Sequence, residues 1–315
     1  MLLTPRKGAI GAIAGLLLFA ACSAAASPSA SVAPSSAMSE GASATAAPTA
    51  TPAPTPVAQV PSDQLLFPGK LVICSDIPYP PQEFFDNNGN PTGSDIEIGQ
   101  AIAQKLGLTA QIENSVFDTI ILAVNGGKCD IIISAQTINP ERQKQVDMIP
   151  YFKAGMEFVV AKGNPDNITQ ATDLCGKKVA AETGTVEVDY MQGTGDYKGA
   201  GLNKTCTDAG KAAVDIQQFQ KDSDALLALS SGQVAAYFAD SPVAGYYTVQ
   251  QPNQFQLSGI IEDVAPEGIS VPKDKTALRD AVKAALLAIM NDGTYTEILK
   301  KYGLEDGAVT PADVG

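Results

Sequence analysis

Histidine is absent from this sequence of 315 residues, and two other features are scarce. Without imidazole, the chain can form neither a histidine-ligated metal site nor a Ser-His-Asp catalytic relay. Basic residues are outnumbered, with 21 Lys and Arg against 34 Asp and Glu, so the net charge of −13 excludes a basic nucleic-acid-binding surface. Long apolar runs are scarce too, since the run over residues 8–21 is too short to span a membrane comfortably. We therefore expect no metal, no cofactor and no nucleic-acid partner.

The first part of the chain has the features of an export signal followed by a tether. A basic start, an apolar run and small residues after it predict a secretory signal peptide over residues 1–21. The end of the run resembles a bacterial lipobox, in which Cys22 is lipidated with palmitate and becomes the mature N-terminus, although Phe19 stands where leucine is preferred. Ordinary signal cleavage, with Cys22 incidental, is the alternative. Residues 22–65 are rich in Ala, Ser, Pro and Thr and predict a disordered tether that leaves the protein outside the cell, anchored to the membrane.

Four further cysteines form an even set in an oxidising compartment. Cys175 and Cys206 flank a glycine-rich polar stretch, and a bridge between them would close a loop of about thirty residues, worth roughly 3–4 kcal/mol. We expect this pair to form a disulfide. Cys74 and Cys129 lie on expected core strands, where buried free thiols or a bridge would both fit, so that pair stays open.

From residue 70 onward, short apolar strands alternate with helical patterns, which favours parallel β-α-β units in two similar lobes. Ser94 and Glu97 match a capping box at the start of one helix. The cleft between two such lobes is the default place for a ligand. The expected strands are residues 71–74, 130–133, 156–161, 179–181, 216–219 and 234–238. The expected helices are residues 94–106, 119–125, 186–191, 224–230 and two between 278 and 302.

Several of these segments resemble the bacterial extracellular solute-binding proteins of family 3, which are the amino-acid receptors of ABC transporters. One departure is Ser94, where that family usually has an aromatic or aliphatic residue. The segments are residues 74–81, 93–98, 117–121, 129–130, 137–142, 184–185, 240–242 and 293–295, in the family's order and spacing, and the resemblance covers residues 66–305. It implies a two-lobed α/β fold of the periplasmic-binding-protein type II, with two crossover hinge strands and the ligand in the interlobe cleft. The implied parts are lobe 1 (66–160 and 260–306), lobe 2 (161–259) and a tail (307–315), with crossovers near residues 159–162 and 257–263.

Arg142 is the first candidate for a ligand contact. It follows the end of a strand, and its guanidinium presents a planar fork that matches a carboxylate. The resemblance implies that Arg142 binds the ligand's α-carboxylate together with the Thr137 hydroxyl and a backbone N–H of Ala135 or Thr137. The alternative is a surface arginine paired with Glu141 or Asp147.

The resemblance implies further contacts from both lobes. Asp240 would accept the ligand's α-ammonium, although an aspartate before Ser-Pro is also a common helix N-cap. Thr185 and the backbone N–H of Val186 would donate to the carboxylate. Tyr79 and Phe117 would pack on the aliphatic part of the ligand, and the alternative for both is a place in the core.

Asp76 and Glu182 match family positions that face the ligand's side chain. Two carboxylates in a closed cleft favour a cation or an amide donor and reject an acidic side chain. The alternative is that one caps a helix and the other is solvated. We therefore expect a basic or polar amino acid as the ligand.

The sequence thus predicts a monomeric, extracytoplasmic substrate-binding protein that passes an amino acid to the permease of an ABC importer, and not an enzyme. Two alternatives come from other classes of protein. The first is a dehydratase of small carboxylates such as arogenate or prephenate, with Asp76 or Glu182 as general acid. The second is a ligand sensor that acts on a membrane partner in trans.

Overall fold

The computed structural model of the protein describes residues 55–315. The expected signal peptide, Cys22 and most of the expected tether lie outside the described residues. Over residues 55–315, none of the helices is both long and apolar enough to cross a bilayer.

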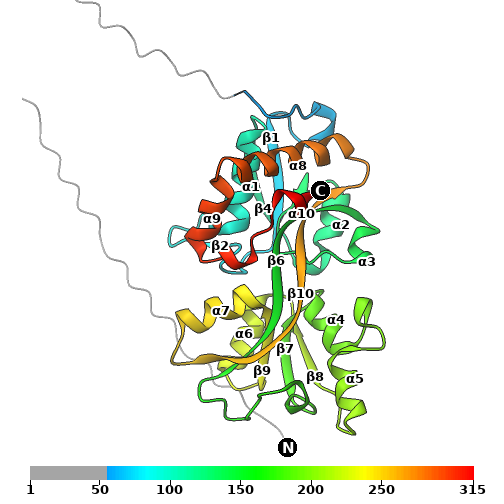
Figure 1. Ribbon diagram of the computed structural model, residues 1–315, viewed down its shortest axis with the longest axis vertical. Helices are drawn as coiled ribbons and strands as arrows, with labels where there is room; N and C mark the ends of the chain where they lie inside the picture. Colours follow the sequence, from blue (N-terminus) through cyan, green and yellow to red (C-terminus); the bar gives the residue numbers. More distant parts are fainter. Residues whose placement is uncertain (1–54) are drawn as a thin grey trace, which may run out of the picture. The chain divides into compact units, whose positions relative to one another are not determined.

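Lobe 1, the upper lobe in Figure 1, combines two separated stretches of the chain. Its elements are β1 (Lys70–Ser75), β2 (Phe84–Phe85), β3 (Pro91–Thr92), α1 (Ser94–Lys105), β4 (Thr109–Asn114), α2 (Ile120–Asn125), β5 (Ile131–Ile132), α3 (Pro140–Gln143), α8 (Thr276–Asn291), α9 (Thr294–Tyr302) and α10 (Pro311–Val314). The apolar run of β1 is buried between parallel neighbours β4 and β5. Helices α1, α8 and α9 contact one another beside the sheet, because apolar residues such as Ile98 and Ile102 recur at helical spacing.

Lobe 2, the lower lobe in Figure 1, is one continuous stretch with its own core. Its elements are β7 (Lys178–Glu182), α4 (Val186–Gln192), α5 (Gly201–Asp208), β8 (Asp215–Phe219), α6 (Asp222–Ser230), β9 (Ala236–Asp240) and α7 (Ser241–Gln250). Strand β7 pairs in parallel with both β8 and β9. The helices lie on both sides of these strands, α6 and α7 on one side and α4 and α5 on the other.

Two long strands, β6 (Val146–Ala161) and β10 (Phe255–Pro272), pair antiparallel and run through both lobes. They join the two sets of strands into one sheet with the order β4-β1-β5-β10-β6-β9-β7-β8. The expected two-lobed α/β fold with two crossover strands is confirmed.

The crossover on β6 lies at another point of that strand than expected. On β6, Ala154 packs in the core of lobe 1 and Met156 already packs in that of lobe 2. On β10, Ile260 packs in lobe 2 and Ile269 in lobe 1. The chain therefore changes lobe earlier on β6 than residues 159–162. On β10 the change falls between residues 260 and 269, which overlaps the expected 257–263. Because both strands are buried in both lobes, their apolar pattern does not mark where one core ends and the other begins.

Two disulfides lie in the described part of the chain, one in each lobe. Cys175 is bonded to Cys206 on α5, the pair expected from the sequence. Cys74 on β1 is bonded to Cys129, which lies two residues before the start of β5. The pair that the sequence leaves open is therefore a bridge and not two free thiols.

The expected capping box at α1 is wrong. The N-cap is Gly93, and no side chain caps the helix. Gly93 has φ +120°, and a Cβ at this position would come within 2.2 Å of the carbonyl oxygen of Gln82, so the chain needs glycine there. Ser94 and Asp95 are consequently the first residues inside the helix, and both are buried.

Both ends of the described chain pack on lobe 1. Val57 donates its N–H to the last turn of α1, and Leu65 is buried in the lobe-1 core. The tether expected to reach residue 65 thus ends earlier, because these apolar side chains find a surface to cover. Val309 and Val314 are buried in the same core, so the segment expected as a tail is part of lobe 1.

Candidate ligand-binding site

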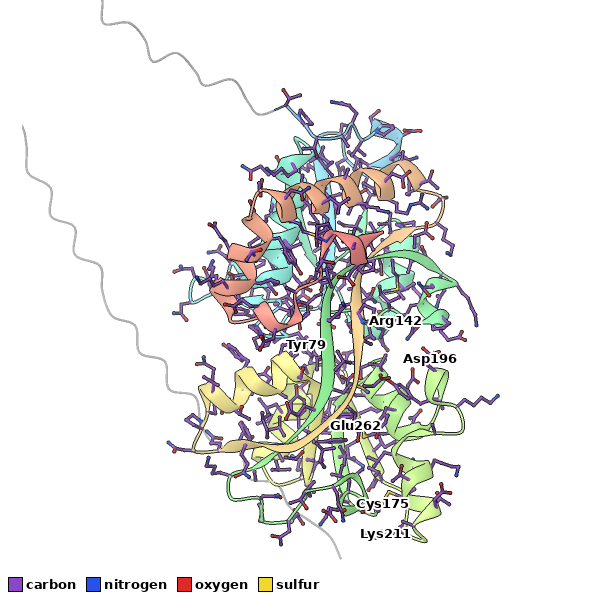
Figure 2. All side chains as sticks on the ribbon, viewed as in Figure 1. Tyr79, Arg142, Cys175, Asp196, Lys211 and Glu262 are labelled. Carbon is purple, nitrogen blue, oxygen red and sulfur yellow. A yellow bond between two sulfur atoms is a disulfide. The ribbon has the colours of Figure 1, made fainter. Side chains whose placement is uncertain are left out.

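A cavity lies where the two lobes meet, in the region marked by Tyr79 and Arg142 in Figure 2. All ten residues expected to contact the ligand line this cavity, and two glutamates that were not expected join them. The lining residues are Asp76, Tyr79, Glu83, Phe117, Ala135, Thr137 and Arg142 from lobe 1, with Glu182, Thr185, Val186, Glu187 and Asp240 from lobe 2.

Arg142 points into the cavity and is not a surface arginine. Helix α3 places it: the Asn139 side chain accepts the N–H of Arg142 at 2.8 Å, and Pro140 begins the helix. Arg142 is 8% exposed, and its guanidinium donates to the carbonyl of Thr137 at 2.8 Å and to that of Gly184, in lobe 2, at 3.1 Å. It also lies over the ring of Phe117, 5.3 Å from the ring centre.

The carboxylates that could have paired with Arg142 at the surface have other partners. Glu141 pairs with Lys144 at 2.6 Å. Asp147 pairs with Lys273 and Arg279, each at 3.0 Å. The surface alternative for Arg142 is therefore wrong.

Two of the expected hydrogen-bond donors are already used inside the protein. The N–H of Ala135 donates to the Asp95 carboxylate at 2.9 Å, so Ala135 offers the cavity its side chain and not its amide. Thr185 donates its hydroxyl to the carbonyl of Glu182 at 2.8 Å. Thr137 and Val186 line the cavity from opposite lobes. Of the two amides considered for a carboxylate in lobe 1, the structure leaves that of Thr137 as the candidate.

Asp240 and Tyr79 form a hydrogen bond between the lobes. Asp240 stands at the N-cap position of α7, but its side chain makes no capping bond. Instead it accepts the Tyr79 hydroxyl at 2.8 Å, and both residues are buried. Burial raises the pKa of Asp240 to about 6, against the opposing effects of the Tyr79 hydrogen bond and the charge of Arg142. Asp240 therefore occupies the N-cap position, as the alternative expects, but its side chain does not cap the helix.

Asp76 and Glu182 stand at the ends of β1 and β7 and face the same cavity. The Asp76 carboxylate accepts a hydrogen bond from the N–H of Phe117. The backbone N–H of Asp76 donates to the hydroxyl oxygen of Ser134 at 2.8 Å. Burial raises the pKa of Asp76 to about 6. Burial, together with the negative charges of Asp222 and Asp76, raises the pKa of Glu182 to about 10. Both carboxyl groups are under one tenth exposed, so neither is the solvated group of the alternative.

Sequence reasoning missed Glu83 and Glu187. Glu83 follows two prolines in an irregular segment and is fully buried, with one oxygen accepting the Ser134 hydroxyl at 2.7 Å. Glu187 lies in the first turn of α4, where an acidic residue is ordinarily explained by the helix dipole. Nothing local in the sequence marks either residue as a cavity residue, because their burial depends on contacts between distant segments.

The cavity is therefore strongly acidic. It presents five carboxyl groups, from Asp76, Glu83, Glu182, Glu187 and Asp240, and one guanidinium. Burial is the largest cause of a raised pKa at each of the five. Burial thus favours the protonated form of each group, and a cation that enters the cavity favours the ionised form.

Comparisons with known proteins agree with this architecture. The sequence profile of the bacterial extracellular solute-binding proteins, family 3, matches residues 71–305. The arginine-binding protein ArgT of Corynebacterium glutamicum is 29% identical over 260 residues, which cover 80% of this chain and 82% of that protein. The glutamine-binding protein GlnH of a Bacillus subtilis ABC transporter is 30% identical over 227 residues, covering 70% and 76%.

A solved structure extends the likeness to three dimensions. An ancestral arginine-binding protein bound to arginine superposes with a TM-score of 0.64 at 37% identity, covering 74% of this chain and 98% of that one. This likeness confirms the periplasmic-binding-protein type II fold, and the profile match spans every residue that lines the cavity. The chain belongs to the bacterial extracellular solute-binding proteins of family 3.

Proposed function

We propose that the protein is the monomeric extracytoplasmic substrate-binding component of an ABC importer, and that its substrate is an amino acid with a cationic side chain. One observation carries the choice of ligand: five carboxyl groups surround a single guanidinium in the interlobe cavity. A cationic ligand offsets the cost of burying these charges, whereas an acidic side chain adds to it. The names of the relatives, which bind arginine or glutamine, support an amino acid.

The two lobes divide the work of binding in this proposal. Arg142 of lobe 1 takes the α-carboxylate with N–H groups that do not face the Thr137 and Gly184 carbonyls. Asp240 of lobe 2 accepts the α-ammonium. A ligand held at both points joins the lobes, which is how hinge closure around a ligand is driven. Asp76 and Glu182, the carboxylates at the other strand ends, then face the cationic side chain.

A thermal-shift and calorimetric series tests the ligand class. The purified protein is titrated with L-arginine, L-lysine, L-citrulline and L-glutamate, of which citrulline is the neutral counterpart of arginine. We expect arginine or lysine to bind best, with about 2.7 kcal/mol of stabilisation at 100 times the dissociation constant. Glutamate that binds more tightly than arginine would contradict the proposal.

Replacing Arg142 tests the orientation of the ligand. We expect Arg142→Ala to lose most of its affinity for L-arginine and to retain that for agmatine, which has no carboxylate. Loss of a charge-assisted, bidentate contact corresponds to about 2–5 kcal/mol. An equal loss for both ligands would place Arg142 at some other part of the molecule bound.

We also propose that Cys22 carries the lipid that anchors the protein to the outer face of the membrane. The lipobox-like sequence before it supports this proposal. Metabolic labelling with a palmitate analogue should mark the wild type, and Cys22→Ser should be unlabelled and released into the soluble fraction. Equal labelling of both proteins would refute the assignment.

A further inference from the structure

Glu187 is a buried carboxyl group that the proposed binding scheme does not use. It lies in the first turn of α4, lines the cavity and is only 2% exposed. Its Oε1 has no hydrogen-bond partner among the described residues. A buried polar atom without a partner destabilises the fold, so a native site that keeps one calls for an explanation.

The nearest charged group of opposite sign does not satisfy Glu187. Within the described part of the chain, no ion pair joins Glu187 to Arg142, whose guanidinium hydrogen bonds go to the Thr137 and Gly184 carbonyls. The Glu187 carboxyl instead lines the same cavity as that of Asp240, whose negative charge is the second cause of its raised pKa. Solvated charge at a helix start is no explanation either, since the residue is out of reach of solvent.

We infer that Glu187 and Asp240 together form the receptor for the ligand's ammonium group, with Glu187 as a second acceptor that selects primary amines. This inference rests on the proposed amino-acid ligand and adds a residue to its recognition. The Tyr79 hydroxyl already donates to one oxygen of Asp240, and the three N–H groups of an ammonium point in different directions, so one carboxylate does not accept all three. The partner-free Oε1 of Glu187 supplies a further acceptor in the same dry cavity.

The pair also predicts that a proton leaves when the ligand enters. Two carboxyl groups in one dry cavity disfavour each other's ionisation, so the empty site holds a proton on the pair. The ammonium brings its own positive charge, and the shared proton passes to the buffer. The pKa of Glu187 is raised by burial and then by the charge of Asp240, which fits a protonated empty site. The titratable groups that face Glu187 are Arg142, Asp240, Tyr79, Glu182 and Tyr197.

Calorimetry with two ligands tests the inference. L-Arginine is compared with 5-guanidinopentanoic acid, which keeps the carboxylate and guanidinium and lacks the α-ammonium. We expect Glu187→Gln to weaken L-arginine binding by about 10- to 100-fold and to leave the binding of the des-amino ligand unchanged. Glu297→Gln, an exposed position on α9, is the control and should bind both ligands as the wild type does.

A second measurement needs no variant. Wild-type protein titrated near pH 7 in buffers of different ionisation enthalpy should release more protons with L-arginine than with 5-guanidinopentanoic acid. Equal proton release, or equal loss of affinity for both ligands in Glu187→Gln, overturns the inference while the proposed function stands. A wild type that binds no basic amino acid overturns the proposed function, and the inference falls with it.

Discussion

Replacing Asp76 with asparagine should make the ligand-free protein more stable at neutral pH. The Asp76 carboxyl is buried at the end of β1, and burial raises its pKa from 3.8 to about 6. Asparagine has nearly the same shape and keeps an oxygen that can accept the N–H of Phe117. The substitution therefore removes the charge and leaves the hydrogen bond in place.

The size of the effect follows from the two pKa values. The folded state holds the proton on Asp76 up to about pH 6, and the unfolded state loses it near 3.8. Stability is then present at low pH and falls as pH rises from the lower value to the higher one. At about 1.4 kcal/mol for each pKa unit, the full loss is about 3 kcal/mol, of which about 2 kcal/mol falls between pH 4.5 and 7.5.

Urea unfolding followed by far-ultraviolet circular dichroism measures this difference, since the chain has no tryptophan to report on unfolding. Between pH 4.5 and 7.5, the exposed carboxyl groups with lowered pKa, such as Asp292 at about 2, stay ionised and contribute no slope. The wild type should lose stability over this range because Asp222 and Asp240 have the same sign of shift as Asp76. Asp76→Asn should lose about 2 kcal/mol less than the wild type.

Two outcomes would refute the reasoning about Asp76. A wild type whose free energy of unfolding rises from pH 4.5 to 7.5 would show that the buried carboxyl groups do not govern stability in this range. Identical pH slopes in the wild type and Asp76→Asn would show that Asp76 is as easily ionised in the fold as outside it. Ligand must be removed by unfolding and refolding before the measurement, because a bound cation would lower these pKa values.

Three further predictions concern the lobes and the contact between them. Removing the bridge with Cys175→Ser and Cys206→Ser should lower the free energy of unfolding by about 3.7 kcal/mol, because the bridge closes a loop with a sequence separation of 31 residues. Ligand affinity, measured by calorimetry, should stay unchanged because Cys175 lies far from Arg142 (Figure 2). A changed affinity would contradict this separation of bridge and site. Gly184→Ala should weaken ligand binding at least about tenfold, because the added Cβ would come within 2.8 Å of Asp118 in the other lobe. Unchanged affinity would show that closure of the lobes does not need the close contact between Gly184 and Asp118. Glu267→Gln should raise the free energy of unfolding in urea by about 1–3 kcal/mol at pH 7.5, and by less at pH 5. The reason is that Glu267 is a buried acid with a raised pKa, and its Oε1 has no partner among the described residues. If stability did not rise, we would conclude that a water molecule hydrogen-bonds Oε1.

The fold could be predicted where a segment's own residues determine its structure. The apolar run of β1 and the helical spacing of α1 and α8 gave elements close to their observed bounds. The long strands β6 and β10 were only partly expected, because a strand that is buried in two successive cores carries no break in its pattern. For the same reason, the crossover point on β6 could not be predicted.

The site could be predicted where a polar residue follows an apolar strand. Asp76, Glu182 and Asp240 all stand at such strand ends, and the cavity gathers all three. What local reasoning could not supply is the partner of each group. The hydroxyl of Tyr79 reaches Asp240 across 161 positions of sequence, and this contact replaces the N-cap that the local pattern favours.

Several departures from local rules lie at the cavity, and they share a physical cause. An N-cap that does not cap, a glutamate without a partner and carboxyl groups with raised pKa values each cost folding free energy. They lie around one space that a cation of the right shape would fill. These groups destabilise the ligand-free fold, and under the proposed function a bound cationic ligand would offset that cost. Stability at neutral pH and affinity for a cationic ligand therefore depend on the same charges. Neutralising Asp76 should for this reason change both, raising the first and lowering the second.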